Sequence, residues 1–390
     1  MDQQRYSLEQ YFEELSDKQN TLLPRPDAYG TLKLQEKINI FTEFEPVKAI
    51  VLGCMSDTSR LPSNEPLLVA NKDQDLKACQ QYPAKICARA REIANEVARK
   101  LVERGIEVRA LGSKWYKSWV EGYSIDKPLW DAANLIRVGL DIIFLISLGG
   151  TESGYQNFKN FMLQRYNGLV RVHPTRVYQG FHIDTTFTTI GYSKILKKYI
   201  LLANSDRTNP TNIPAIFRGK NWVVLNSPAM IDMGYEPGFQ IATPSLGQNI
   251  LVLNPNLVLI DEYQKPLIEV LQFYGIESLT VKHEIGRSVA GGFHCMANDY
   301  SREETIDFEK ILGTPIDQLS AEEKAGYFDP VLLNFLQSNG DIEHWEEIAN
   351  QNAIFPEYLT EHLSFEEKEV LARDHREQIE SAKIGVKQFN

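Results

Sequence analysis

Residues 249–276, NILVLNPNLVLIDEYQKPLIEVLQFYGI, indicate the fold class of the chain. The segment opens with two apolar, β-branched runs separated by Asn-Pro-Asn, which predicts two short strands. It continues with KPLIEVLQFYG, whose apolar spacing predicts a helix that ends at Gly275. Strands followed directly by a helix are typical of a mixed α/β domain.

Similar patterns recur toward the N-terminus. The run AKICARAREIANEVARKLVERG, residues 84–105, predicts a helix closed by Gly105. Its apolar face is formed by Ile86, Ile93, Val97 and Leu101. Further β-branched runs predict strands that begin at Val47, Ile106, Asp141, Phe181 and Asn221. The alternation continues to about residue 300 and predicts an α/β fold for this part of the chain.

Composition divides the chain into three expected parts. Residues 1–35 form an N-terminal helix and linker, residues 36–302 an α/β domain, and residues 303–390 an acidic helical extension. From Ser301 to Asn390 there are 20 acidic and 8 basic residues, whereas the preceding residues are nearly balanced. No basic stripe suited to nucleic acid is present. The extension is expected to be a solvated helical appendage, with dimerisation or partner docking as alternatives.

Other features exclude further classes of protein. The N-terminus shows no signal-peptide pattern and no apolar run reaches the length of a membrane span, so we expect a soluble, cytoplasmic enzyme. The four cysteines lie far apart without paired spacing, at Cys54, Cys79, Cys87 and Cys295. Neither a disulfide framework, a zinc site nor any cofactor is therefore indicated.

The segment AGGFHCM, residues 290–296, is the first candidate for chemistry. Two glycines allow a tight turn that presents Cys295 to a cleft. A free cysteine is more often buried in a core than used as a nucleophile, and the motif alone leaves both interpretations open.

The segment FHIDTTF supplies a second candidate. If it forms a strand, His182 and Asp184 project to the same side and reach one pocket. A base beside a carboxylate suits proton transfer at a thiol. The alternatives are two hydrogen-bonded polar residues in a half-buried strand, or a metal site, for which the spacing gives little support.

A third candidate is PLWDAANLIRVG, which begins at Pro128. An aspartate just before an apolar-periodic run is typical of a helix N-cap, and residue type alone assigns that role to Asp131.

The order and wording of these segments resemble the arginine:glycine amidinotransferase family of the pentein superfamily. The family pattern contains segments similar to DAADFIRAG, HIDATF and GGFHCWT, and this chain has DAANLIRVG, HIDTTF and GGFHCMA in the same order. The likeness extends from FEPVKAIVLG near Phe44 to about Arg302, and LLANSDR resembles the family's LSNPDR. The resemblance implies a five-bladed α/β propeller with the active site in its central channel.

The resemblance also implies residue roles. Cys295 matches the nucleophile, His182 the proton shuttle and Asp131 the carboxylate that orients the histidine. A thiolate stabilised by a nearby imidazolium can attack an electron-poor carbon, after which the imidazole protonates the departing amine.

Three further positions match substrate-binding residues of the family. Asp184 matches a carboxylate that binds the guanidinium, Arg207 a group that binds the α-carboxylate of arginine, and Ser245 a serine in contact with substrate. The family's Pro-Arg-Asp segment, which supplies a second guanidinium carboxylate, is missing. The nearest acid, Asp126, lacks the expected context, and Asn134 replaces the second aspartate of the DAAD pattern.

Two enzymatic functions and one binding function follow from these observations. The family default moves an amidino group from arginine to an amine through Cys295. The alternative uses the same triad to move an acyl group from a thioester, with an acyl carrier protein as a partner, because a thioester needs no guanidinium clamp. A binding or assembly protein is the third reading, against which the retained Cys-His-Asp set argues. We expect small-molecule amine and amino-acid substrates, no nucleic acid or membrane partner, and a homodimer as one possible assembly.

Overall fold

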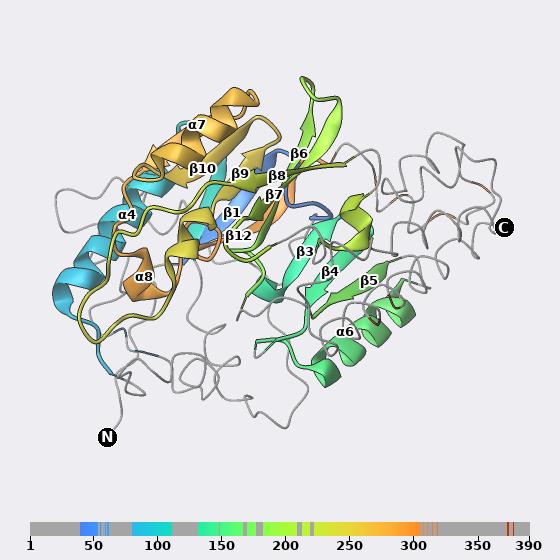
Figure 1. Ribbon diagram of the computed structural model, residues 1–390, viewed down its shortest axis with the longest axis horizontal. Coiled ribbons are helices and arrows are strands. Elements are labelled where there is room, and N and C mark those ends of the chain that lie inside the picture. Colours follow the sequence, from blue (N-terminus) through green and yellow to red (C-terminus); the bar gives the residue numbers. More distant parts are fainter. Residues whose placement is uncertain are drawn as a thin grey trace.

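The computed structural model describes eight ranges, namely residues 40–53, 80–110, 132–147, 149–166, 170–176, 182–208, 213–218 and 222–304. It also describes single residues at positions 55, 59, 61, 307, 310, 314, 318, 373 and 377. In these ranges, short sheets and flanking helices alternate, so the α/β fold class is confirmed (Figure 1). No helix in the described part of the chain is both long and apolar enough to cross a membrane.

The described strands form four sheets of three strands each. The first contains β1 (Val47–Leu52), β2 (Glu107–Ala110) and β12 (Ala297–Arg302). The second contains β3 (Leu135–Val138), β4 (Asp141–Leu145) and β5 (Arg171–Thr175). The third contains β6 (Phe187–Ser193), β7 (Lys198–Asn204) and β8 (Trp222–Ser227). The fourth contains β9 (Leu251–Asn254), β10 (Leu257–Asp261) and β11 (Glu277–Val281).

All four sheets share one topology. The middle strand pairs antiparallel with one neighbour and parallel with the other, as β4 does with β3 and β5. A parallel pair needs a crossover connection, and three helices provide it. These are α4 (Ala84–Val102) before β2, α6 (Glu152–Arg165) before β5, and α7 (Lys265–Phe273) before β11. In Figure 1, α4 and α7 lie on one flank of the molecule and α6 lies on the opposite side.

The sheet of β12, β1 and β2 joins the two ends of the described domain. Val47 of β1 pairs with Arg302 of β12, and Ala49 pairs with Ser301. The side chain of Glu304 then accepts hydrogen bonds from the backbone nitrogens of Phe41 and Thr42. The repeated units are therefore closed by strands from opposite ends of the domain.

Apolar side chains form two large cores between the sheets. One includes Phe187, Leu201 and Ile260, which join the third and fourth sheets. The other includes Ile50 and Val281 and packs against α4. Each core is shared by several sheets, which fixes the units relative to one another and so positions the loops at their ends.

The helices predicted from periodicity are confirmed. The predicted apolar face of α4 is buried throughout, and Gly105 and Gly275 follow their helices with positive φ of 77° and 76°. The predicted strands at 47, 106, 141, 221 and in 249–261 are also present. Within the described ranges there are four sheet units, and the fifth blade remains a prediction.

The predicted terminal parts fall mostly outside the described residues. Residues 1–35 lie wholly outside them, and the domain boundaries remain predictions. From the extension, Glu377 contacts the second sheet unit, where its carboxylate accepts hydrogen bonds from Arg176 at 3.2 and 3.3 Å. Arg176 also binds Glu152 of α6. This point of the extension is therefore packed on the α/β domain.

Candidate active site

The loop that carries Cys295 lies between the short helix α8 (Gly286–Val289) and strand β12. Ala290 has a left-handed backbone with φ 59°, which turns the chain out of the helix. A Cβ atom at Gly292 would lie 2.7 Å from Asn249, so this position accepts only glycine without movement. The loop ends with Cys295 exposed to solvent, so the interpretation of Cys295 as a core cysteine is wrong.

The segment with His182 and Asp184 differs from the prediction. Residues 182–186 form a turn, and strand β6 begins only at Phe187. The backbone nitrogens of Thr186 and Phe187 both bind the carbonyl oxygen of Ile183, which bends the chain and prevents ladder pairing. The turn still places the Asp184 carboxylate, which is 5% exposed, beside the loop that carries Cys295.

One carboxylate oxygen joins the two halves of the site. Asp184 Oδ2 accepts a hydrogen bond from Cys295 Sγ at 3.2 Å and contacts His294 Nδ1 at 3.0 Å. Because a carboxylate can only accept, Nδ1 of His294 carries the proton. Burial opposes ionisation of Asp184. The hydrogen bond and charge of His294, the charge of His182 and the hydrogen bond from Cys295 together outweigh burial and lower the pKa of Asp184 to about 2.

These neighbours set the charge of the thiol and of the imidazole. Desolvation by the surrounding protein and the Asp184 carboxylate raise the pKa of Cys295 well above its usual value. Desolvation also opposes the charged form of His294, but Asp184 outweighs it and raises the pKa of His294. In the absence of substrate, the site therefore favours a neutral thiol beside a carboxylate and an imidazolium.

A network of charged side chains packs next to His294 and contacts it through Glu43. Arg137 donates to Glu43 through its backbone nitrogen at 3.1 Å and to Asp299 through its guanidinium at 3.0 Å. Arg302 donates to the other oxygen of Asp299. Burial opposes ionisation of Asp299, but the two arginines outweigh it and hold its pKa far below the usual range. Glu43 Oε2 lies 3.9 Å from His294 Nε2, so the network reaches the active-site imidazole.

No protein-family model matches this chain. The chain is 31% identical over 182 residues to inosamine-phosphate amidinotransferase 1 of Streptomyces glaucescens, covering 46% of this chain and 49% of that protein. It is 29% identical over 240 residues to a putative inosamine-phosphate amidinotransferase 2 of Streptomyces griseus, covering 57% and 64%. With the mitochondrial glycine amidinotransferase of Gallus gallus it shares 28% over 180 residues, covering 46% and 40%.

The chain is thus similar to amidinotransferases over about half of its length. It spans about half the length of the curated relatives it matches. Its fold is that of a solved inosamine-phosphate amidinotransferase from Streptomyces griseus, with a TM-score of 0.59 at 19% identity over 70% of this chain and 98% of that one. An amidinotransferase of saxitoxin biosynthesis from Microseira wollei gives 0.57 at 18%, over 69% and 98%. The pentein-type fold expected from the sequence is thus confirmed.

Arg207 and Ser245 lie close to the same loops. Arg207 donates to Thr185 Oγ1 and to Thr243 Oγ1, each at 2.7 Å, and so bridges the turn beside Asp184 to the segment before Ser245. Ser245 is buried in the short helix η3 (Pro244–Gln248). The structure thus brings Arg207 into the neighbourhood of Asp184 and places Ser245 two residues after Thr243, to which Arg207 is bound.

Asp131 lies outside the described residues, and its roles as catalytic carboxylate or N-cap remain predictions. The segment after it is not the helix that an N-cap would require. A single turn, η1 (Ala132–Asn134), leads directly into strand β3. Asn134 is fully buried, and its Nδ2 donates to the Leu145 carbonyl and to Ser147 Oγ at 3.1 and 2.9 Å. Asn134 therefore acts structurally here. Asp126 also lies outside the described residues.

Sequence reasoning missed three polar groups of the site. His294 directly precedes Cys295, and its position in the motif could have identified it. Glu43 and Asn249 lie far from Cys295 in the chain, and no local pattern marks them. Among the described residues, no group of three acidic, histidine or cysteine side chains is arranged to hold a metal ion.

Proposed function

We propose that the chain is an amidinotransferase that moves an amidino group from arginine to an amine acceptor through a covalent adduct on Cys295. The observation that carries this proposal is the exposed residue Cys295, whose Sγ lies 3.2 Å from Asp184 Oδ2, in a fold similar to that of amidinotransferases. The sequence likeness to three amidinotransferases supports the same reaction class.

In the first half-reaction, the Cys295 thiol loses its proton to His182, and the sulfur attacks the guanidinium carbon. The bond between that carbon and the side-chain nitrogen of arginine breaks. The leaving nitrogen takes a proton from the His182 imidazolium, and ornithine departs. The amidino group is then held on sulfur as a thiouronium.

In the second half-reaction, the acceptor amine attacks the amidino carbon and loses a proton to His182. The carbon–sulfur bond breaks, and the electron pair returns to Cys295. Asp131 is proposed to hold the imidazole of His182 in the productive orientation, as the resemblance implies. The cycle needs no cofactor, because each proton released in one step is taken up in another.

Asp184 and Arg207 are proposed to bind the two ends of the donor. Asp184 would receive the guanidinium, for which a carboxylate is a suitable partner. Arg207 would bind the α-carboxylate of arginine, and Ser245 would add a polar contact. In the free site, Asp184 is already bound to His294, so a cationic donor must compete with an imidazolium. We therefore expect arginine binding to strengthen as His294 loses its proton at higher pH.

The experiment is mass spectrometry of the intact protein after incubation with arginine or, separately, with an acyl thioester. The amidinotransferase proposal predicts an amidino mass on Cys295 and release of ornithine, both absent from Cys295→Ser. Cys87→Ser is the matched control, since Cys87 is a buried cysteine of α4. An acyl mass on Cys295, with no reaction toward arginine, would replace the proposal with acyl transfer. None of the relatives named above is an acyltransferase.

Several finer expectations accompany the proposal. The acceptor is a small-molecule amine, and the reaction belongs to a biosynthetic process. An acyl carrier protein is expected as a partner only if the experiment shows transfer from a thioester. Homodimer formation and a cytoplasmic location remain predictions from the sequence, and size-exclusion chromatography with light scattering tests the first of them.

A further inference from the structure

Asn249 connects the nucleophile loop to the fourth sheet. It follows η3 and precedes β9, and it is 2% exposed. Its backbone carbonyl accepts hydrogen bonds from the nitrogens of Phe293 at 2.9 Å and His294 at 3.3 Å. Two consecutive peptide groups of the loop are therefore anchored to this one residue.

The side chain of Asn249 contacts the loop at three further points. Its Oδ1 accepts hydrogen bonds from the backbone nitrogens of Gly292 at 3.1 Å and Cys295 at 3.0 Å. Its Nδ2 lies 3.2 Å from Cys295 Sγ. Since both backbone groups are donors, the amide oxygen must face them, and this settles the orientation of the amide. The Nδ2 group is thereby directed at the sulfur as a donor.

This donor opposes the other strong influence on the sulfur. Asp184 faces Cys295 Sγ with a negative charge, which disfavours a thiolate. In the part of the chain that the structure describes, no other side chain donates a hydrogen bond to Sγ. A hydrogen bond to the charged form favours that form, so the backbone nitrogen of Gly292 and the Asn249 side chain both counteract the effect of Asp184.

We propose that Asn249 is a catalytic residue, which stabilises the Cys295 thiolate through Nδ2 and fixes the geometry of the nucleophile loop through Oδ1. The proposal rests on the proposed role of Cys295 as the nucleophile. When the thiol proton leaves for the base, the electron pair stays on sulfur and accepts the Nδ2–H bond. When the carbon–sulfur bond breaks in the second half-reaction, the same bond stabilises the returning thiolate. Asn249 thus serves both half-reactions.

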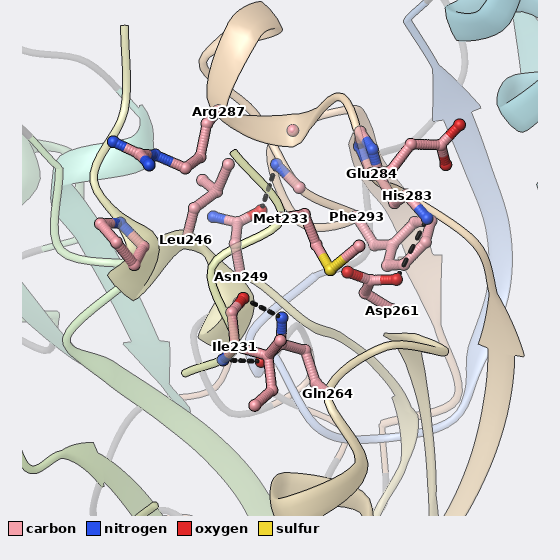
Figure 2. Close-up of a pocket in the computed structure, with 14 residues that line it drawn as sticks. Ile231, Met233, Leu246, Asn249, Asp261, Gln264, His283, Glu284, Arg287 and Phe293 are labelled. Carbon is pink, nitrogen blue, oxygen red and sulfur yellow. Dashed lines mark hydrogen bonds between the residues drawn. The ribbon is translucent and has the colours of Figure 1, made fainter. Parts of the chain in front are cut away.

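Two substitutions separate the electrostatic role from the scaffold role. Asn249→Asp keeps an oxygen for the nitrogens of Gly292 and Cys295, but it replaces the donor with a second carboxylate beside the sulfur. Asn249→Ala removes the donor and the acceptor without adding charge. Neither aspartate nor alanine is larger than asparagine, so neither change forces a larger side chain into the core. Asn249 also lies beside a pocket lined by Leu246, Phe293 and other residues (Figure 2).

The assay is the rate of Cys295 alkylation by iodoacetamide as a function of pH, measured by peptide mass spectrometry. We expect the inflection to move to higher pH in both variants, and the Asn249→Asp rate at pH 7 to fall by about tenfold or more. Asn256→Asp is the control, because Asn256 is exposed in the turn between β9 and β10 and should keep the original profile. Circular dichroism verifies that each variant is folded.

A folded Asn249→Asp variant with an unchanged alkylation profile would overturn the proposal. If that variant does not fold, the test uses Asn249→Ala instead. The Cys295 thiolate is then titrated by its ultraviolet absorbance, taken as the difference between Asn249→Ala and the double variant Asn249→Ala with Cys295→Ser. An unchanged titration there also overturns it. These measurements need no donor substrate. An active Cys295→Ser enzyme would instead refute the proposed function. The effect of Asn249 on the Cys295 thiol would still be tested by the thiol titration alone.

Discussion

Asp184→Asn is expected to change thiol reactivity and turnover in opposite directions. The substitution removes the negative charge beside Cys295 Sγ while preserving the size of the side chain. The thiolate then forms at lower pH, so alkylation of Cys295 at neutral pH should become faster. Turnover with arginine should fall, because the carboxylate proposed to bind the guanidinium has been lost.

The magnitude follows from the distance between the two groups. A full charge 3.2 Å from the sulfur disfavours the thiolate by about 5 kcal/mol at an effective dielectric constant of about 20. Solvent reaches Cys295, so screening weakens this interaction. Even about a quarter of it, roughly 1.3 kcal/mol, corresponds to nearly tenfold more thiolate at a pH below the thiol pKa.

The assay is pseudo-first-order alkylation by iodoacetamide between pH 5.5 and 9, alongside ornithine release from arginine. Glu277→Gln serves as control, because Glu277 is an exposed acid on β11. An alkylation rate at pH 7 that stays constant or falls in a folded Asp184→Asn variant would refute the reasoning, because the loss of this adjacent charge is expected to favour the thiolate more than the accompanying loss of the His294 proton disfavours it.

Two further predictions concern stability. Arg137→Leu removes the guanidinium that contacts the buried Asp299 and the half-buried Glu43, and it should lower the free energy of unfolding by about 3–5 kcal/mol. Urea denaturation measures this, and a loss no larger than that of Arg99→Leu, which removes a surface helical ion pair, would contradict it. Burial lowers the pKa of His283 from 6.5 to about 4. As the pH falls from 6.5 toward 4, His283 becomes protonated in the unfolded chain but stays neutral in the folded chain. The free energy of unfolding should therefore drop by about 3 kcal/mol between pH 7 and 4. His283→Gln should remove this component, and urea titrations at both pH values that show the same drop in the variant would exclude it.

The sequence was most informative where apolar periodicity is strong. Helix α4 and the β9–β10–α7 segment could be predicted, because one face of each element is buried and its spacing is visible in the chain. Strand β12, ANDYSR, could not be predicted in this way. Two of its buried side chains, Asp299 and Arg302, form a charged pair. Because they are not apolar, the hydrophobic pattern of the sequence does not indicate a strand there.

The candidate site shows the same limit. The motifs identified Cys295 and Asp184, whose proximity is a result of folding between two separate loops. They could not identify Asn249, because its contacts to Cys295 cross 46 residues and arise from the packing of η3 on the nucleophile loop. The turn at His182 was mistaken for the start of a strand, because β-branched residues continue without interruption into β6.

The pairing of β1 with β12 has a consequence for synthesis on the ribosome. Strand β1 emerges early, but its antiparallel partner follows about 250 residues later, as Val47 pairs with Arg302. Until then one edge of β1 has no strand to pair with, and the loop that carries Cys295, directly before β12, is not anchored at its C-terminal end. A nascent chain should therefore acquire thiol reactivity late, after the other three sheets have had time to form. Chains that stop before residue 297 should expose the β1 edge and aggregate.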